Sequence, residues 1–271
     1  MKGAVPRLSI MLVGDAGRTE FRDARICLDR WGVVHGFSEI AAAAAALAEA
    51  EVVPDVIVVA QAFPGQFSHQ GIEQLRRLAP LARVVGLMGS WCEGEMRTGS
   101  PWPGVVRTYW HQWTARCNRE LRRLARGQCC SWALPPTATE EERLLTNTAE
   151  PRPRQDGVVV ICAWSHEAAD WLSAACRRRG FATIWQRTSA TARARGATAI
   201  IFDGGSFDEV EYQQLQHLAA TVRPTPVLAL LAFPRLEDQR RALSAGAAAV
   251  LSKPLAVDDL CGELDRVSRQ E

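Results

Sequence analysis

The feature that most constrains the fold is a rhythm of short apolar runs and helical patterns, which occurs twice along the chain. The runs are apolar throughout, as expected of strands that are buried on both faces of a parallel sheet. They cover residues 8–13, 32–37, 54–60 and 82–88 in the first half and residues 157–162, 181–185, 198–203, 225–231 and 247–251 in the second. The rhythm predicts the α/β class, with two doubly wound domains in tandem and a five-stranded parallel sheet in each.

The segments between these runs have the periodicity of helices. We expect helices over residues 19–31, 40–50, 71–81, 167–179, 208–220, 236–245 and 257–267, and a short helix between residues 185 and 198. Thr139 and Glu142 have the spacing of a capping box, which predicts a further short helix. The prediction is a first domain over 1–126, a linker with a short helix over 127–156, and a second domain over 157–271.

Charge and hydropathy exclude several classes of protein. The 271 residues carry 32 basic and 30 acidic side chains, so no strong overall field favours nucleic acid or a membrane surface. No apolar run approaches the ~18–20 residues that a membrane span needs, and the N-terminus lacks the pattern of a secretory signal. We therefore expect a cytoplasmic protein with no membrane partner. No nucleic-acid-binding module is recognisable, so a nucleic-acid partner is not expected either.

Two stretches of the second half carry a family resemblance. Ala199-Ile-Ile-Phe-Asp203 is a buried strand that ends in an aspartate, and the second stretch runs from Ala242 through Ala-Gly-Ala to Lys253-Pro254. Lys253 is also one of only two lysines in the chain. Over residues 157–270 the sequence resembles the CheY-like receiver domain of two-component response regulators, which has a flavodoxin-like (βα)5 fold.

The resemblance implies a phosphorylation site that is incomplete here. In the family an aspartate at the position of Asp203 accepts a phosphoryl group from a histidine kinase, and a lysine at the position of Lys253 contacts that group. An acidic pair after the first strand helps to hold Mg²⁺, but these positions are Cys162 and Ala163, which offer no hard oxygen ligand. The position of the switch Thr or Ser is Leu231. We therefore expect no cofactor, and Mg²⁺ only if Asp203 is phosphorylated.

The first half diverges further and is interpreted as a pseudo-receiver domain. The resemblance places Gly14 and Asp15 at the acidic pair and Ala60 at the acceptor position, so no acyl phosphate can form there. The switch position is Met88, and equal spacing puts Trp110 where the lysine belongs. Asp15 is expected to cap the turn after the strand rather than to hold a metal.

Residues 89–104 form a Trp/Gly/Pro-rich loop in place of the expected fourth helix, because glycine and proline at this density cannot sustain one. Trp and Arg dominate binding hot spots, so the segment 89–113 is a candidate interaction surface. Its candidate residues are Trp91, Glu93, Glu95, Arg97, Trp102, Trp110, His111 and Trp113. The alternative is that the tryptophans form a small core. A third interpretation, catalysis by acidic or histidine side chains of this loop, has no supporting spacing.

Three functional hypotheses remain open. The first is a signalling protein that acts through protein contacts without phosphorylation, with Asp203 and Lys253 joined as an ion pair. The second is a genuine phosphorelay response regulator that a histidine kinase phosphorylates on Asp203. The third is a ligand-binding or catalytic role of residues 89–113. We expect the first, no enzyme activity, and protein partners such as a histidine kinase, another regulator or a second copy of the chain.

Overall fold

The computed structural model describes residues 7–135, 137–148, 155–187 and 196–268. Contacts within the chain divide it into two compact units, residues 1–149 and residues 150–271. Among the helices of the described residues, none combines the length and the hydropathy that crossing a bilayer requires.

The first unit is built on a five-stranded sheet with the order β2-β1-β3-β4-β5. All paired strands are parallel, with Val13 of β1 beside Phe37 of β2 on one side and Val59 of β3 on the other. The strands are β1 (Leu8–Val13), β2 (Gly32–Phe37), β3 (Val56–Gln61), β4 (Arg83–Met88) and β5 (Val106–Tyr109). Every residue of β3 is buried, which explains why its sequence is apolar without alternation.

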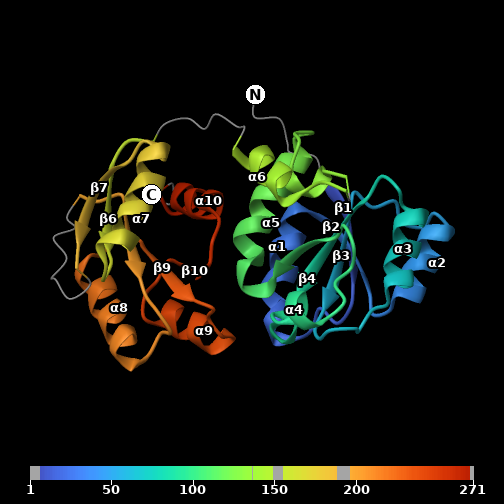
Figure 1. Cartoon of the computed structure of the whole chain (residues 1–271), viewed down its shortest axis with the longest axis horizontal. Helices are drawn as coiled ribbons and strands as arrows, with labels where there is room; N and C mark the ends of the chain where they lie inside the picture. Colours follow the sequence, from blue (N-terminus) through green and yellow to red (C-terminus); the bar gives the residue numbers. More distant parts are fainter. Residues whose placement is uncertain (1–6, 136, 149–154, 188–195, 269–271) are drawn as a thin grey trace. The chain divides into compact units, whose positions relative to one another are not determined.

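Helices cover both faces of this sheet. Figure 1 shows α1 and α5 on one face and α2 and α3 on the other. The helical elements are the 3₁₀ turn η1 (Thr19–Phe21), α1 (Arg22–Trp31), α2 (Ile40–Ala48), α3 (His69–Leu78) and α5 (Trp110–Ala125). α2 is almost entirely alanine, and its helical structure agrees with the high helix propensity of alanine. Its buried residues lie on one face, and the helix packs beside α3.

The loop after β4 has little helical structure, in line with its glycine and proline content. It contains only the 3₁₀ turn η2 (Ser90–Cys92) and the single-turn α4 (Glu95–Thr98). Cys92 and Trp102 of this loop enter the core on the α2–α3 face of the sheet, and Trp102 Nε1 donates to Phe67 O at 3.1 Å. The side chains of Cys92 and Trp102 therefore cover the part of the core where a full fourth helix was expected to pack.

The segment after α5 belongs to the first unit, which differs from the predicted linker over 127–156. It holds the 3₁₀ turn η3 (Ser131–Ala133) and the expected short helix α6 (Glu140–Thr148). Glu142 accepts from the backbone of Thr139 at 2.8 Å, and the hydroxyl of Thr139 accepts from Glu142 N at 3.2 Å, as in a capping box. The rest of the predicted linker, through Arg154, lies outside the described residues.

One buried carboxylate anchors this segment. Glu120 of α5 has no exposed surface, and its Oε2 accepts from Ser131 N at 2.7 Å and from Ser131 Oγ at 2.8 Å. Arg143 of α6 donates to Ser131 O at 2.8 Å. Trp132 packs on Trp113 of α5 with ring centroids 5.7 Å apart. The segment therefore belongs to the first unit because polar and aromatic contacts attach it to α5. These contacts join residues 11 or more positions apart in sequence, so local sequence patterns do not show them.

The second unit repeats the architecture with the order β10-β9-β8-β6-β7, again all parallel. Its strands are β6 (Val158–Cys162), β7 (Ala182–Gln186), β8 (Ala199–Asp203), β9 (Val227–Ala232) and β10 (Ala249–Lys253). Its helices are α7 (His166–Arg179), α8 (Glu209–Thr221), α9 (Leu236–Ser244) and α10 (Val257–Val267). The short helix expected before residue 198 falls largely on residues outside the description.

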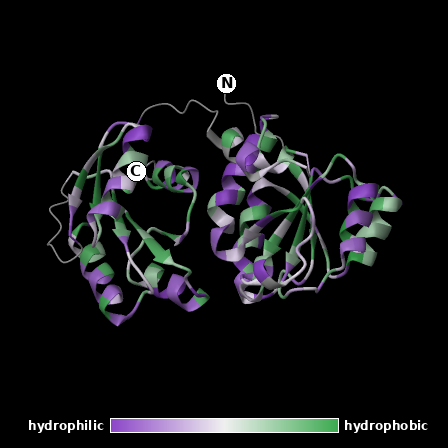
Figure 2. Ribbon diagram, viewed as in Figure 1, coloured by the Kyte–Doolittle hydropathy of each residue, from purple (hydrophilic) through white to green (hydrophobic). Residues whose placement is uncertain are grey.

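Both strand orders read 2-1-3-4-5 when numbered within each unit, which is the flavodoxin-like doubly wound order. This confirms the predicted class, two tandem five-stranded domains of the receiver-like fold. Figure 2 shows the strands in hydrophobic colours and polar residues gathered on the helices around them. In such folds the carboxyl ends of the strands form the edge where ligands bind, so the candidate site is sought there in each unit.

Candidate functional site

Two charged side chains meet at the carboxyl edge of the second sheet. Asp203 ends β8 and Lys253 ends β10, and Lys253 Nζ lies 2.7 Å from Asp203 Oδ1. The two side chains are 12% and 27% exposed. β9 separates the two strands, and the long lysine side chain bridges that distance. The predicted ion pair is therefore present, with one carboxylate and one ammonium compensating each other.

The positions of the acidic pair hold no metal ligand suited to Mg²⁺. Cys162 and Ala163 are both buried, and Gln186 Nε2 donates to Cys162 Sγ at 3.2 Å. Burial raises the pKa of the Cys162 thiol, although the hydrogen bond from Gln186 partly opposes that shift. A neutral thiol and a methyl group do not fit a hard cation that prefers oxygen ligands. Within the described residues, no group of three His, Cys, Asp or Glu side chains is arranged to hold a metal ion.

The switch position is apolar in the structure as well. Leu231 is fully buried in the core between β9 and the helices α8 and α9. It packs so close to Gly204 that a Cβ atom built on this glycine would lie 3.0 Å from Leu231 Cδ2. A hydroxyl that could bond to a phosphoryl oxygen is absent from this position, so the receiver-type switch has no donor there.

The strand registers show which residues of the first unit correspond to the acidic-pair positions of the second. Cys162 lies beside Phe202, which precedes Asp203, and Val13 lies beside Val59, which precedes Ala60. The acidic-pair positions in the first unit are therefore Val13 and Gly14, one residue earlier than the sequence comparison placed them.

Gly14 itself cannot carry a longer side chain without rearrangement. It has φ +114°, and a Cβ there would lie 2.4 Å from Ala60 O. Asp15, one residue beyond, accepts from Gly17 N at 3.0 Å and so caps the turn as expected. The same register logic places Trp110 two residues beyond Thr108, at the position that Lys253 has in the second unit.

A buried polar network occupies the carboxyl edge of the first sheet. Gln61, the last residue of β3, donates through Nε2 to Glu95 Oε2 at 3.2 Å. Arg107 of β5 forms an ion pair with the same carboxylate, whose side chain is 3% exposed. Cys92 Sγ lies 3.7 Å from Gln61 Nε2. This network fastens the single turn of α4 to the strands, so Glu95 has a bound partner on each side rather than a free carboxylate.

The structure corrects the prediction that the whole 89–113 segment forms a surface. Five of its eight candidate residues are buried, because they pack into the core or join the network at the strand ends; they are Glu95, Trp102, Trp110, His111 and Trp113. Three are exposed, namely Trp91, Glu93 and Arg97. Trp91 is 75% exposed, and the neighbouring Met96 is 63% exposed. The tryptophans of this segment are therefore buried, except for Trp91. Trp102 lies in the core on the α2–α3 face, and Trp113 of α5 packs on Trp132.

The sequence does not predict that Gln61, Arg107 and Glu120 belong to buried polar networks. Arg107 and Glu120 could have been found only by asking why a charged residue interrupts an apolar pattern. Glu20 was also missed: its Oε2 accepts from Ser90 N and Ser90 Oγ, both at 3.0 Å, and it ties the loop after β1 to the loop after β4. Burial, and secondarily the charge of Glu20, raises the pKa of Glu93 beside it.

His111 is a buried imidazole at this edge. Its side chain is 2% exposed and stacks on Tyr109, with ring centroids 5.8 Å apart. Its Nε2 lies 3.4 Å from Glu93 Oε1, yet neither ring nitrogen has a hydrogen bond of good geometry within the described part of the chain. Burial, and secondarily the charge of Arg116, lowers the pKa of His111 from 6.5 to about 4.

This shift predicts that acid destabilises the first unit. The unfolded chain binds the proton more tightly than the folded chain does, so the stabilising contribution is complete above about pH 6.5 and disappears as the pH falls toward 4. The expected loss between pH 7 and pH 4 is about 3 kcal/mol. Urea unfolding over this range should show that loss in the native chain and not in His111→Phe. The exposed His217→Phe serves as the control and should retain it, and identical pH profiles for His111→Phe and the native chain would contradict the assignment.

Comparisons with known proteins find similarity to solved structures alone. No family model matches the chain, and no curated protein matches it. Solved structures that are similar include NtrX from Brucella abortus in complex with ADP (15% identity, TM-score 0.38), covering 42% of this chain and 26% of that one. An orphan response regulator of H. pylori has 14% identity and TM-score 0.35, covering 43% of this chain and all of that one. A Francisella response regulator receiver domain has 18% identity and TM-score 0.37, covering 42% and 98%.

These similarities are too distant to carry an argument about activity, so the class rests on the strand order and the site. The chain consists of two receiver-like domains of the flavodoxin-like fold. The second retains an aspartate and a lysine at its carboxyl edge, and the first has neither at the corresponding positions, Ala60 and Trp110.

Proposed function

We propose that the protein is a signalling protein of the response-regulator type that acts through protein contacts without phosphorylation and without enzyme activity. The observation that carries this proposal is the replacement of the acidic pair by the buried Cys162 and Ala163, beside the strand that ends in Asp203. Phosphoryl transfer requires that charge on the transferring oxygens be neutralised in place, and Mg²⁺ supplies much of that charge. With Cys162 and Ala163 in place of the acidic pair, those two positions offer no side-chain oxygen that would hold the ion.

Exposed aromatic side chains at the same edge support a role in protein contacts. Trp164 follows Ala163 directly and is 49% exposed, and Trp185 at the end of β7 is 41% exposed. Phe233 follows β9, is 64% exposed, and donates its backbone amide to Lys253 O at 3.3 Å. Aromatic side chains supply much of the energy of protein interfaces. A protein partner, whether a kinase, another regulator or a second copy of the chain, would find them next to the ion pair.

The test is phosphodonor treatment followed by measurement of the intact mass. We expect the native chain to gain no phosphoryl group from acetyl phosphate with Mg²⁺. The double variant Cys162→Asp, Ala163→Asp restores two carboxylates at the acidic-pair positions and is expected to gain one phosphoryl group. Adding Asp203→Asn to that double variant should remove the gain. Thermal unfolding shows whether the variants are folded, since both new carboxylates start from buried positions.

A second candidate function has one observation in its favour. Asp203 and Lys253 are retained at the strand ends, in the arrangement that phosphoryl transfer to an aspartate uses in receivers. If the native chain gains a phosphoryl group that Asp203→Asn abolishes, the protein is a phosphorelay response regulator, and the proposal above is wrong. A catalytic role of residues 89–113 has no such support, because Glu95 and His111 are buried.

A further inference from the structure

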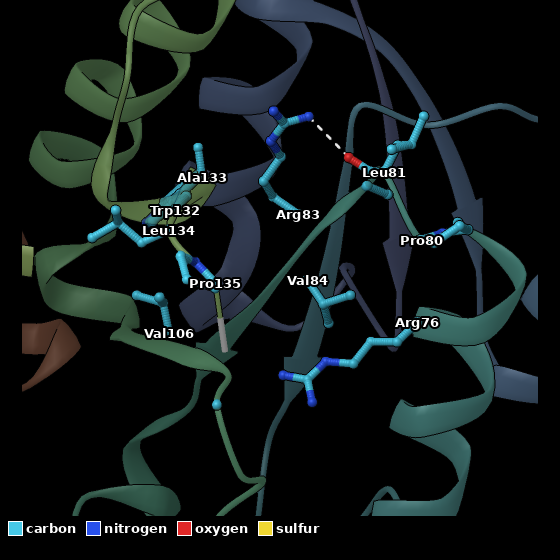
Figure 3. Close-up of a pocket in the computed structure, with 13 residues that line it drawn as sticks. Arg76, Pro80, Leu81, Arg83, Val84, Val106, Trp132, Ala133, Leu134 and Pro135 are labelled. Carbon is cyan, nitrogen blue, oxygen red and sulfur yellow. Dashed lines mark hydrogen bonds between the residues drawn. The ribbon is translucent and has the colours of Figure 1, made fainter. Parts of the chain in front are cut away.

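A cavity of about 400 Å³ lies at the amino ends of β4 and β5, far along these strands from the carboxyl edge described above. Figure 3 shows that it is bounded by the end of α3 and the loop that follows it, by the two strand starts, and by η3 with the two residues after it. Its lining comprises Arg76, Ala79, Pro80, Leu81, Ala82, Arg83, Val84, Gly104, Val106, Trp132, Ala133, Leu134 and Pro135. Ligand pockets in proteins begin at roughly 300 Å³, so this volume suits a small molecule.

The wall formed by residues 132–135 is held in place by several independent contacts. Glu120 fixes Ser131 through two hydrogen bonds, and Trp132 packs against Trp113 in the core. Arg143 donates to Ser131 O at 2.8 Å and to Pro135 O at 3.4 Å. In the second unit the last described element is α10, the helix after the last strand, whereas in the first unit η3 and α6 follow α5. This additional segment supplies one wall of the cavity. A fixed wall keeps the cavity open at little conformational cost on binding.

The charges of the lining select for an anion. It contains two arginines and no acidic residue. Arg83 Nη1 donates to Leu81 O at 2.9 Å, and within the described residues its guanidinium forms no ion pair. Arg76 pairs at 2.5 Å with Glu73, whose side chain is 48% exposed. Arg83 therefore has donors available for a carboxylate, sulfonate or phosphate group, which guanidinium binds through charge-assisted hydrogen bonds.

The remaining lining is apolar and calls for an apolar body on the ligand. Val106 of β5 lies on the same face of the sheet as Arg83, because it pairs with Val85, two residues after Arg83 on β4. Trp132 and Leu134 of the added segment also line the cavity, as Figure 3 shows. Burial of apolar ligand surface against such side chains contributes roughly 25 cal/mol per Å². A bare inorganic anion would leave this surface unused.

We propose that this cavity is a binding site for a small organic anion, with its acidic group at Arg83 and its aromatic or aliphatic body against Val106, Trp132 and Leu134. Such a site would make the first unit a sensor of a small molecule, which goes beyond the contact role proposed for the chain. The cavity does not contain the candidate interaction residues of the segment 89–113, which contributes only Gly104 and Val106 to its lining.

The test uses two fluorescent probes that differ in charge. The probes are 8-anilinonaphthalene-1-sulfonate and its neutral analogue N-phenyl-1-naphthylamine, titrated into the full chain. We expect the sulfonate to bind saturably, and Arg83→Gln to weaken it at least tenfold while changing the affinity for the neutral probe less than twofold. Arg97→Gln, which removes an exposed arginine outside the cavity, is the matched control and should change neither affinity. Inorganic phosphate should compete at least tenfold more weakly than the sulfonate.

The location is checked by two-dimensional NMR of the ¹⁵N-labelled chain with the sulfonate probe. The largest amide shifts are expected at Ala82, Val106 and Ala133, and not at the exposed Trp91. The proposal is overturned if the sulfonate does not bind, if Arg83→Gln leaves its affinity unchanged, or if the shifts centre on another surface. Equal competition by inorganic phosphate would overturn the assignment of an apolar body to the ligand.

Discussion

Replacing Glu120 by alanine is expected to lower the free energy of unfolding of the first unit by about 3–5 kcal/mol, the range found when one partner of a buried charged network is removed. Glu120 has no exposed surface and accepts hydrogen bonds from Ser131 N, from Ser131 Oγ and from Arg119 Nε, the last at 3.0 Å. Alanine would leave these donors without their acceptor and open a void between α5 and η3. The result would be loss of the contact that holds residues 131–135 on the unit.

The measurement is urea unfolding together with hydrogen exchange of the amides of residues 131–134. Exchange at these amides should accelerate in Glu120→Ala even under conditions where the sheet stays folded. Glu142→Ala is the control, because Glu142 is exposed and caps only the start of α6; it should cost about 1 kcal/mol or less. A change within 1 kcal/mol for Glu120→Ala, or unchanged exchange at residues 131–134, would show that the segment is held by other contacts.

The sequence predicted most of the fold because its local signals agree with the tertiary structure. The helix expected over 257–267 is α10 with the same ends, and Asp208 caps α8 as its side chain accepts from Glu211 N at 2.9 Å. The buried strands were recognisable because both of their faces are covered, which leaves a continuous apolar run. The meeting of Asp203 and Lys253 also followed, since parallel strands bring their carboxyl ends to one edge.

The missed elements depend on contacts between distant residues. β5 is only four residues long and includes Arg107 and Thr108, so its sequence does not resemble a buried strand. Arg107 is tolerated there because Glu95 pairs with it, and the sequence does not show that pairing. The prolines at 135, 136, 151 and 153 indicate a linker after α5, whereas Glu120 and Trp113 hold residues 131 and 132 in place. The cavity escaped for the same reason, as its walls come from three separate segments.

The tryptophans were ambiguous for a different reason. Tryptophan is favoured both in cores and in the centres of interfaces, because it combines a large apolar surface with a polar N–H group. Sequence position alone could not separate the two roles in residues 89–113. The exposed fractions do so, at 0% for Trp113 and 75% for Trp91.

The second large effect is therefore expected from Trp113→Ala. Trp113 lies on α5 with no exposed surface and packs against Trp132, so the substitution removes the largest fully buried side chain of the chain's described part. Large-to-small substitution of a buried aromatic residue costs about 3–5 kcal/mol, because the surrounding side chains collapse only partly into the cavity. Trp91→Ala is the matched control. Since Trp91 is largely exposed, its removal should change the free energy of unfolding by less than about 0.5 kcal/mol.

Urea unfolding of both variants measures this contrast, and a binding assay extends it. If the exposed part of residues 89–113 contacts a protein partner, Trp91→Ala should weaken that complex while leaving the fold intact, because an exposed tryptophan can act as an interface anchor. Trp113→Ala should instead act through stability, so that Trp113→Phe, which refills most of the volume, recovers the greater part of the loss. Equal destabilisation by Trp91→Ala and Trp113→Ala would contradict the division of these tryptophans into buried side chains and one exposed side chain.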